Sequence, residues 1–128
     1  MTKGPEEWFK QSDYDIKTAG AMFVARRYVY VVFMCHLSLE KALKGLYQKQ
    51  IGTVPPKVHN LIFLIEAVGV TLPDALYEAV FSLNRASIPT RYPEDLKQMQ
   101  KDYPKQKTEE LLVQSKEVLK WLKKELKK

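Results

Sequence analysis

The chain has 128 residues, of which 45% are hydrophobic and 28% charged, enough for one domain with a hydrophobic core and too few for two. Its net charge of +6 comes mainly from residues 105–128, which hold eight lysines and four glutamates. This lysine-rich segment is either a solvated helix face or a surface that binds a polyanion. Cys35 is the one cysteine and no apolar run could span a bilayer, so we exclude an internal disulfide framework and expect a cytoplasmic protein without membrane contact.

The first half of the chain predicts two long antiparallel helices. Pro5 opens the first helix, which ends near residues 25–27. The second helix follows almost at once, over residues 28–52, with Gly52 at its C-terminus. Apolar spacings of three and four indicate a buried seam on this central helix. The predicted seam residues are Val32, His36, Leu39, Leu43 and Leu46.

The second half of the chain predicts shorter helices separated by prolines. A stiff linker at residues 53–56 precedes a helix over 58–68, and residues 71–74 form a capping-box pattern that opens the next helix. Residues 87–104 contain three prolines and interspersed charge, which predict an irregular, functional or mobile connection. The last helix is expected to follow Thr108 as its N-cap. Since no strand alternation occurs, we predict one all-α domain over residues 1–128, an antiparallel up-and-down bundle of four to five helices.

Three polar side chains interrupt the apolar central helix at intervals of one turn: His36, Glu40 and Lys44. His36 and Glu40 can meet at this spacing, either as a core imidazole satisfied by the carboxylate or as part of a polar site. A carboxylate on a core helix needs a cationic partner. Arg91 is a candidate, and we expect its charged atoms within about 4 Å of those of Glu40.

Two further positions carry candidate site residues. His59, at the start of the third helix, could cap or pack there, or reach a neighbouring segment. Arg91 and Tyr92 precede a proline; Arg can bind a carboxylate or phosphate bidentately while Tyr stacks on a base or fills a core gap. A structural anchor and a ligand-contacting site remain open for this pair. There is no glycine-rich phosphate loop, zinc-ligand spacing or nucleophile elbow, so we predict no metal and no cofactor.

Four motifs, in this order along the chain, resemble the HEPN (higher eukaryotes and prokaryotes nucleotide-binding) domain family. They are Trp8, then His36-x3-Glu40-Lys41-x2-Lys44, then His59-Asn60-Leu61, then Arg91-Tyr92-Pro93-Glu94. Together they extend over essentially the whole chain.

The resemblance implies a helical bundle that often forms a homodimer. It also implies the type of small stand-alone prokaryotic protein that is paired with a minimal nucleotidyltransferase in a toxin–antitoxin-like system. Many members are metal-independent ribonucleases whose motif places an Arg a few positions before a His, and neither His36 nor His59 has an Arg at that spacing.

We therefore predict a non-catalytic module that binds a nucleotide or RNA, or docks to a nucleotidyltransferase. Its ligand- or partner-binding residues are expected to be Glu40, Lys44, Arg91 and Tyr92. The alternatives are a ribonuclease toxin that uses His36 or His59, and a purely structural interaction module.

Overall fold

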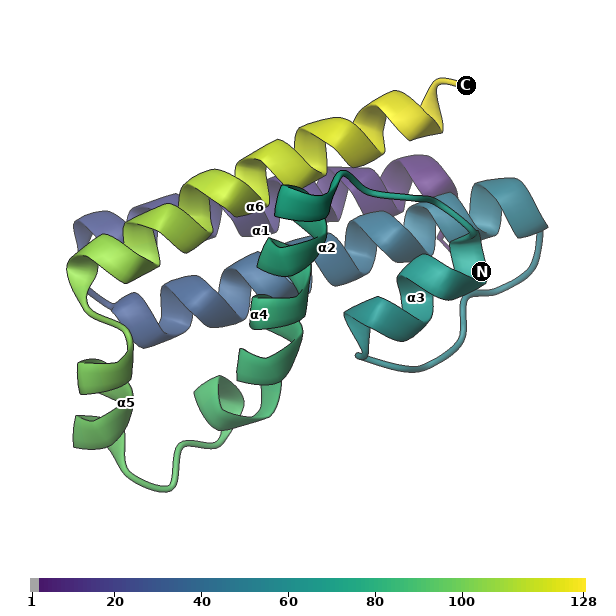
Figure 1. Cartoon of the computed structure of the whole chain (residues 1–128). Helices are drawn as coiled ribbons and strands as arrows, with labels where there is room; N and C mark the ends of the chain where they lie inside the picture. Colours follow the sequence, from purple (N-terminus) through teal and green to yellow (C-terminus); the bar gives the residue numbers. More distant parts are fainter. Residues whose placement is uncertain (1–2) are drawn as a thin grey trace.

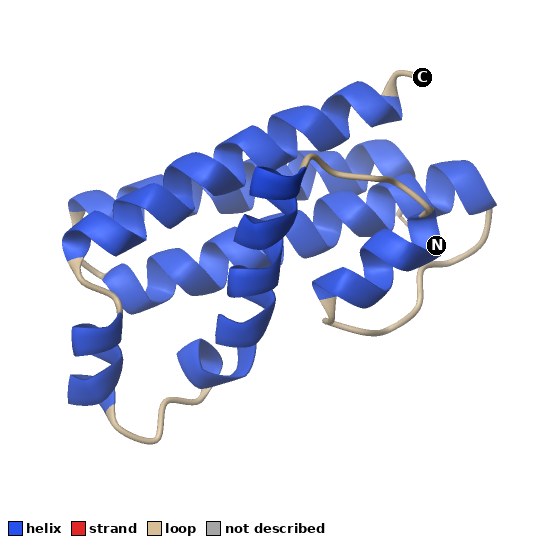
Figure 2. Cartoon of the chain, in the orientation of Figure 1, coloured by secondary structure: helices blue, strands red, loops and turns tan. Residues whose placement is uncertain are grey.

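The computed structural model describes residues 3–128, and within that range the chain folds into six α-helices and no strand (Figure 1, Figure 2). In chain order they are α1 Pro5–Val24, α2 Tyr28–Ile51, α3 Leu61–Val68, α4 Asp74–Arg91, α5 Leu96–Asp102 and α6 Lys105–Leu126. This confirms the predicted all-α class, with one helix more than expected. Among the described helices, none combines the length and the apolar character that a membrane crossing requires.

The helices pack as a bundle around α2, which contacts every other helix. α1, α2 and α6 lie side by side along the long dimension of the molecule, and α4 crosses them (Figure 1). Because α2 lies at the centre, almost its whole circumference is buried. The predicted seam of Val32, His36, Leu39, Leu43 and Leu46 is buried throughout, and Val31, Cys35 and Ala42 extend it.

Small and polar side chains let α1 and α2 approach closely. Ser12 Oγ donates to the Ser38 carbonyl at 2.7 Å, and Ser38 Oγ donates back to the Ser12 carbonyl at 2.8 Å. A Cβ atom added at Gly45 would lie 2.9 Å from the ring of Phe9. These contacts fix the register of the antiparallel pair, because a shifted register would leave buried hydroxyls without partners.

An ion pair closes the same interface. Asp15 is buried on α1, and its Oδ2 lies 2.9 Å from Nζ of Lys41 on α2. A buried carboxylate needs such a partner.

The segment 87–104 is more helical than predicted. α4 continues through Pro89 to Arg91, and α5 occupies residues 96–102. Pro89 is tolerated because it stands in the last turn, where its missing N–H removes a single helical bond, to the carbonyl of Arg85. Asp95 caps α5, since its Oδ1 accepts a hydrogen bond from the Gln98 N–H at 3.2 Å. The prediction of an irregular connection was therefore wrong for most of these residues.

Three predicted helix starts also differ from the structure. Asn60 caps α3, so His59 lies just before that helix. The N-cap of α4 is Pro73 without a side-chain hydrogen bond, so the capping box expected at residues 71–74 does not form. α6 begins at Lys105, and Thr108 is a buried residue of its first turn that donates to the Tyr103 carbonyl at 3.2 Å.

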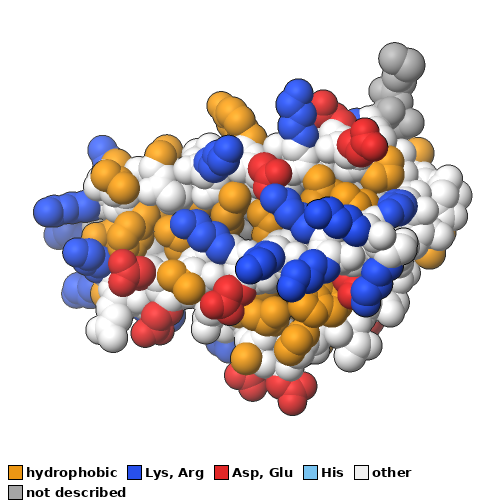
Figure 3. Space-filling model, turned by 90° about the horizontal axis from the view of Figure 1, so that it is seen from above, with side chains coloured by type: hydrophobic (Ala, Val, Ile, Leu, Met, Phe, Trp, Pro, Cys, Tyr) orange, Lys and Arg blue, Asp and Glu red, His pale blue; other side chains and the backbone are white. Residues whose placement is uncertain are grey.

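α6 has a buried apolar side and a basic outer side. Leu111, Val118 and Leu122 pack into the core, while exposed lysines follow the outer side of the helix. Seen from above, blue Lys and Arg side chains form a band across this face (Figure 3).

Candidate functional site

Four side chains surround the carboxylate of Glu40 in the middle of α2. Lys44 Nζ donates to Glu40 Oε2 at 3.0 Å. His59 Nδ1 lies 3.0 Å from Oε2 and 3.1 Å from Oε1. Arg91 Nη2 lies 3.7 Å from Oε1, and His36 Nδ1 lies 3.8 Å from the same oxygen. We call these five residues the Glu40 cluster. The expected approach of Glu40 and Arg91 is confirmed.

Separate elements bring the members of the cluster together. His36, Glu40 and Lys44 stand one turn apart on α2. Glu40 precedes Lys44 by four residues, the favourable order for an ion pair on a helix. Arg91 is the last residue of α4, and the additional turn of that helix beyond residue 87 carries it to α2.

His59 is positioned by the hydrogen bonds that begin α3. Asn60 Oδ1 accepts from the Phe63 N–H at 3.0 Å, and the Leu61 N–H donates to Oδ1 of Asn84 on α4 at 2.8 Å. The start of α3 is therefore tied to α4. This places His59 beside Glu40, so of the two roles considered from sequence, contact with a neighbouring segment is the one observed.

The imidazole of His36 is buried, with 1% of its surface exposed, and neither ring nitrogen has a hydrogen-bond partner within residues 3–128. The 3.8 Å separation from Glu40 is too long for a hydrogen bond. Burial lowers the pKa of His36 to about 4; the charge of Glu40 opposes this shift and that of Arg91 adds to it. His36 is therefore neutral at physiological pH. The interpretation of His36 as an imidazole satisfied by Glu40 was wrong, because Glu40 is engaged by Lys44 and His59 instead.

Arg91 lies between an aromatic ring and the carboxylate. Its Cζ atom is 4.8 Å from the ring centroid of Phe33, a cation–π distance. Arg91 Nη2 is buried and has no hydrogen-bond partner in the described chain, although its charge is close to Glu40. The guanidinium is thus oriented by Phe33 and Glu40 and keeps unused donor capacity.

The cluster opens to the surface on one side. The side chain of His59 is 65% exposed and that of Arg91 is 21% exposed, whereas Lys44 and Glu40 are nearly buried. A small anion approaching from solvent would therefore meet His59 and Arg91 before it met Lys44.

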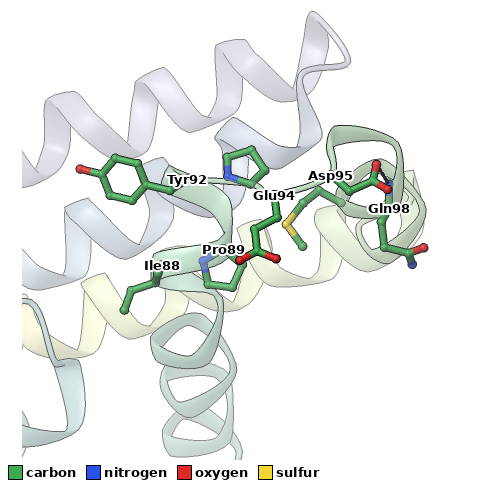
Figure 4. A pocket seen from close by; sticks show the side chains of 8 residues that line it. Ile88, Pro89, Tyr92, Glu94, Asp95 and Gln98 are labelled. Carbon is green, nitrogen blue, oxygen red and sulfur yellow. Dashed lines mark hydrogen bonds between the residues drawn. The ribbon is translucent and has the colours of Figure 1, made fainter.

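Tyr92 does not join the Glu40 cluster. It is 77% exposed and lines a neighbouring pocket of about 340 Å³, together with Ile88, Pro89, Pro93, Glu94, Asp95, Gln98 and Met99. Figure 4 shows Ile88, Pro89 and Tyr92 on one side of this pocket and Asp95 and Gln98 on the other. Arg91 and Tyr92 are adjacent in the sequence motif, but Arg91 contacts Glu40 whereas Tyr92 lines the separate pocket.

Phe33 was not predicted as a site residue. It stands two turns before Glu40 on α2, and positions seven residues apart share a helix face. That spacing was the available signal, although an aromatic residue in an apolar helix is ordinarily assigned to the core. No group of three or more His, Cys, Asp or Glu in residues 3–128 is arranged to hold a metal ion.

The chain is similar to known proteins in sequence and in fold. A model of the HEPN domain matches residues 5–126. TT1696 from Thermus thermophilus is similar with a TM-score of 0.81 and 24% identity, over 94% of this chain and 96% of that one. ST0689, described as an archaeal HEPN homologue, is similar with a TM-score of 0.78 and 23% identity, over 97% of this chain and 98% of that one. At these identities the two structures show a shared fold alone. The search of curated proteins found no match.

Proposed function

This chain belongs to the HEPN domain family, and we propose that it is a non-catalytic member that binds the phosphate group of a nucleotide at the Glu40 cluster. The observation that carries the proposal is the guanidinium of Arg91, which lies 4.8 Å from the ring centroid of Phe33 and 3.7 Å from Glu40 and remains 21% exposed to solvent. Arg91 and Lys44 place two positive charges beside the single negative charge of Glu40. The cluster thus has a positive surplus and unused donors, the combination that phosphate oxygens complement.

The surroundings of Arg91 suit the rest of a nucleotide. Tyr92 is the next residue and is largely exposed, so its ring is available to stack on a base. Tyr92 also lines a mostly apolar pocket of about 340 Å³, which provides room for a base or a sugar. In this assignment Glu40 and Lys44 are positioning residues, and Arg91 and Tyr92 contact the ligand.

Titration calorimetry with ATP and GTP tests this proposal. Arg91→Ala should weaken binding at least about tenfold, since charge-assisted hydrogen bonds contribute roughly 1.5 kcal/mol or more. Arg91→Lys should restore only part of it, because an ammonium group lacks the planar fork. Arg27→Ala, at an exposed arginine outside the Glu40 cluster, is the matched control and should leave the affinity within about twofold. Equal losses in Arg91→Ala and Arg27→Ala, or no binding by the wild type, would reject the site.

A second candidate function, metal-independent RNA cleavage, is favoured by the orientation of His59. A carboxylate only accepts hydrogen bonds, so Nδ1 of His59 carries the proton shared with Glu40. With the proton on Nδ1, the lone pair of Nε2 could take the proton of a ribose 2′-hydroxyl. Arg91 would hold the scissile phosphate.

The two candidates predict opposite outcomes with RNA in the presence of EDTA. Nuclease activity requires cleavage by the wild type, loss of cleavage in His59→Asn, and retention in His36→Asn, because His36 is buried. The first proposal predicts intact RNA in every case.

We further propose that the chain forms a homodimer through α4. Tyr77, Phe81 and Ile88 are 37%, 46% and 70% exposed, and their spacings of four and seven place them on one side of the helix. Glu78 and Arg85 border this stripe. In an antiparallel pairing of two α4 helices about a two-fold axis, Glu78 of each copy faces Arg85 of the other, so the stripe is complementary to itself.

Light scattering coupled to size exclusion tests the dimer. Glu78→Arg and Arg85→Glu should each weaken it, because like charges then meet across the axis. The double exchange should restore it, which no effect on folding alone would do. A wild-type monomer at about 100 µM, far above the Kd of ordinary dimers, would overturn the proposal and leave the stripe to another protein, such as a minimal nucleotidyltransferase.

A further inference from the structure

A second positively charged surface lies on α1 and α6, and it includes no residue of the Glu40 cluster. Lysines on the outer sides of the two helices are exposed, and Figure 3 shows a band of Lys and Arg side chains on the face seen from above. We call the following six residues the basic face: Lys10, Lys17, Lys116, Lys120, Lys124 and Lys127.

The fold does not neutralise this charge. The ion pair that joins α1 to α6 is made by Lys123 with Asp13, and the pair at the end of α6 is made by Lys128 with Glu125. None of the six lysines of the basic face forms an ion pair with another described residue. From residue 116 to 124, α6 holds four lysines and one glutamate.

The arrangement is unfavourable for the isolated chain. Lys116, Lys120 and Lys124 follow at intervals of four, and like charges at that spacing destabilise a helix. Successive lysines are about 6 Å apart along the axis, less than the Debye length of about 8 Å at physiological salt, so their fields add. A bound polyanion would turn this repulsion into attraction.

An exposed aromatic side chain lies within the basic face. Tyr14 is 74% exposed and stands between Lys10 and Lys17 at helical spacings of four and three, on the same side of α1. Its ring is therefore available to a ligand. Cations that follow a phosphate chain, combined with an aromatic ring on which a base stacks, are the usual features of surfaces that bind single-stranded nucleic acid.

An anionic membrane is a less suitable partner for this surface. A helix that lies on a membrane inserts apolar side chains between the lipids. On α6 those side chains, among them Leu111, Val118 and Leu122, are buried in the core. A phosphate backbone requires no such insertion.

We propose that the basic face binds single-stranded nucleic acid, with the lysines of α6 along the phosphate backbone and Tyr14 stacked on a base. From Lys116 to Lys127 the lysines extend over about 16 Å, enough to contact several consecutive phosphates. This inference is independent of the proposed nucleotide site.

Fluorescence anisotropy with labelled oligo(rU) and oligo(dT) of about 20 nucleotides tests the proposal. Lys120→Glu/Lys124→Glu should weaken binding more than tenfold. It should also reduce the slope of log K against log salt by at least about 1.4, because two phosphate contacts are lost. Tyr14→Ala should weaken binding roughly tenfold while Tyr14→Phe retains it. Circular dichroism confirms that each variant is folded.

The matched control is Lys97→Glu/Lys101→Glu on α5, which changes the net charge by the same amount on exposed residues outside the basic face. It should leave the affinity within about threefold. The proposal is overturned if the two double variants weaken binding equally, since net charge alone would then be responsible. It is also overturned if phosphatidylserine vesicles bind and the oligonucleotides do not. The proposal is likewise overturned if Arg91→Ala abolishes oligonucleotide binding while the lysine variants do not, because the Glu40 cluster is then the nucleic-acid site.

Discussion

Arg91 Nη2 lies 3.7 Å from Glu40 Oε1, which joins the end of α4 to the middle of α2. Glu40 is 4% exposed, so its negative charge depends on the cations that surround it. The geometry makes Glu40 the centre of the cluster and Arg91 the member that closes it from the surface.

Glu40→Gln should lower the free energy of unfolding by about 2 to 3 kcal/mol. The amide keeps the shape of the side chain but leaves Lys44, which is nearly buried, and Arg91 without a counter-charge. Urea denaturation measures the loss. Glu125→Gln, which removes the exposed pair with Lys128, is the control and should cost less than about 0.5 kcal/mol. Similar losses in both variants would mean that the Glu40 cluster does not stabilise the fold.

Stability should fall as the pH drops from about 6.5 to about 4 because of His36. Burial holds the pKa of His36 at about 4 in the folded chain, below its ordinary value of 6.5. The unfolded chain therefore takes up a proton first, and the contribution that is complete above pH 6.5 is lost towards pH 4. Between these two pH values His36 should lower the free energy of unfolding by about 3 kcal/mol in total.

Urea denaturation at pH 7, 6 and 5 checks this dependence. Glu40, Arg91 and His59 also face the imidazole, so the relevant quantity is the difference between the wild type and His36→Asn. In His36→Asn, the free energy of unfolding should change much less between pH 6.5 and pH 5 than it does in the wild type. An unchanged slope would assign the pH dependence to other groups.

Gly45→Ala should destabilise the protein by about 1 to 3 kcal/mol through overpacking. The new methyl group would lie 2.9 Å from the ring of Phe9 and 3.0 Å from Cβ of Trp8, and the latter cannot move without α1. Gly20→Ala is the matched control on α1, because no atom lies within 4 Å of its added Cβ. That variant should gain about 0.5 to 1 kcal/mol from helix propensity. The midpoint of thermal unfolding should therefore fall in Gly45→Ala and rise in Gly20→Ala. Shifts of the same sign in the two variants would contradict the close α1–α2 contact.

Cys35 should resist thiol reagents in the folded protein. Burial raises the pKa of its thiol to about 11, against an opposing hydrogen bond from Ser115, so very little reactive thiolate forms at pH 8. Its reaction with a disulfide reagent should be slow in buffer and complete in denaturant. Rapid reaction in buffer would show that the centre of α2 opens frequently.

The sequence identified the main features of the core because apolar spacing carries that information. The α2 seam was predicted from Val32 to Leu46, since nearly the whole of that helix is buried. The segment 87–104 was mispredicted because Pro89 and the nearby charges resemble a linker, whereas a proline in a last helical turn removes one hydrogen bond and no more. Local patterns do not distinguish these situations.

The partners of Glu40 were predictable only in part. A buried carboxylate required a cation, which indicated Arg91 correctly; the closer contact with Lys44 was not predicted. His59 was left open because its position depends on Asn60 and Asn84, a contact between two helices that sequence spacing does not reveal. The same limitation produced the error at His36, because its expected partner, Glu40, is engaged by Lys44 and His59.

The reciprocal hydrogen bonds of Ser12 and Ser38 have a consequence for the order of folding. They join helices that are consecutive in the chain, so the α1–α2 hairpin closes a short loop and is favoured as an early nucleus. The contact between Glu40 and Arg91 closes a much longer loop, because Arg91 lies at the far end of α4. The loss of chain entropy is therefore larger, and this contact is expected to form after the hairpin. The Glu40 cluster is therefore assembled after the α1–α2 hairpin has formed.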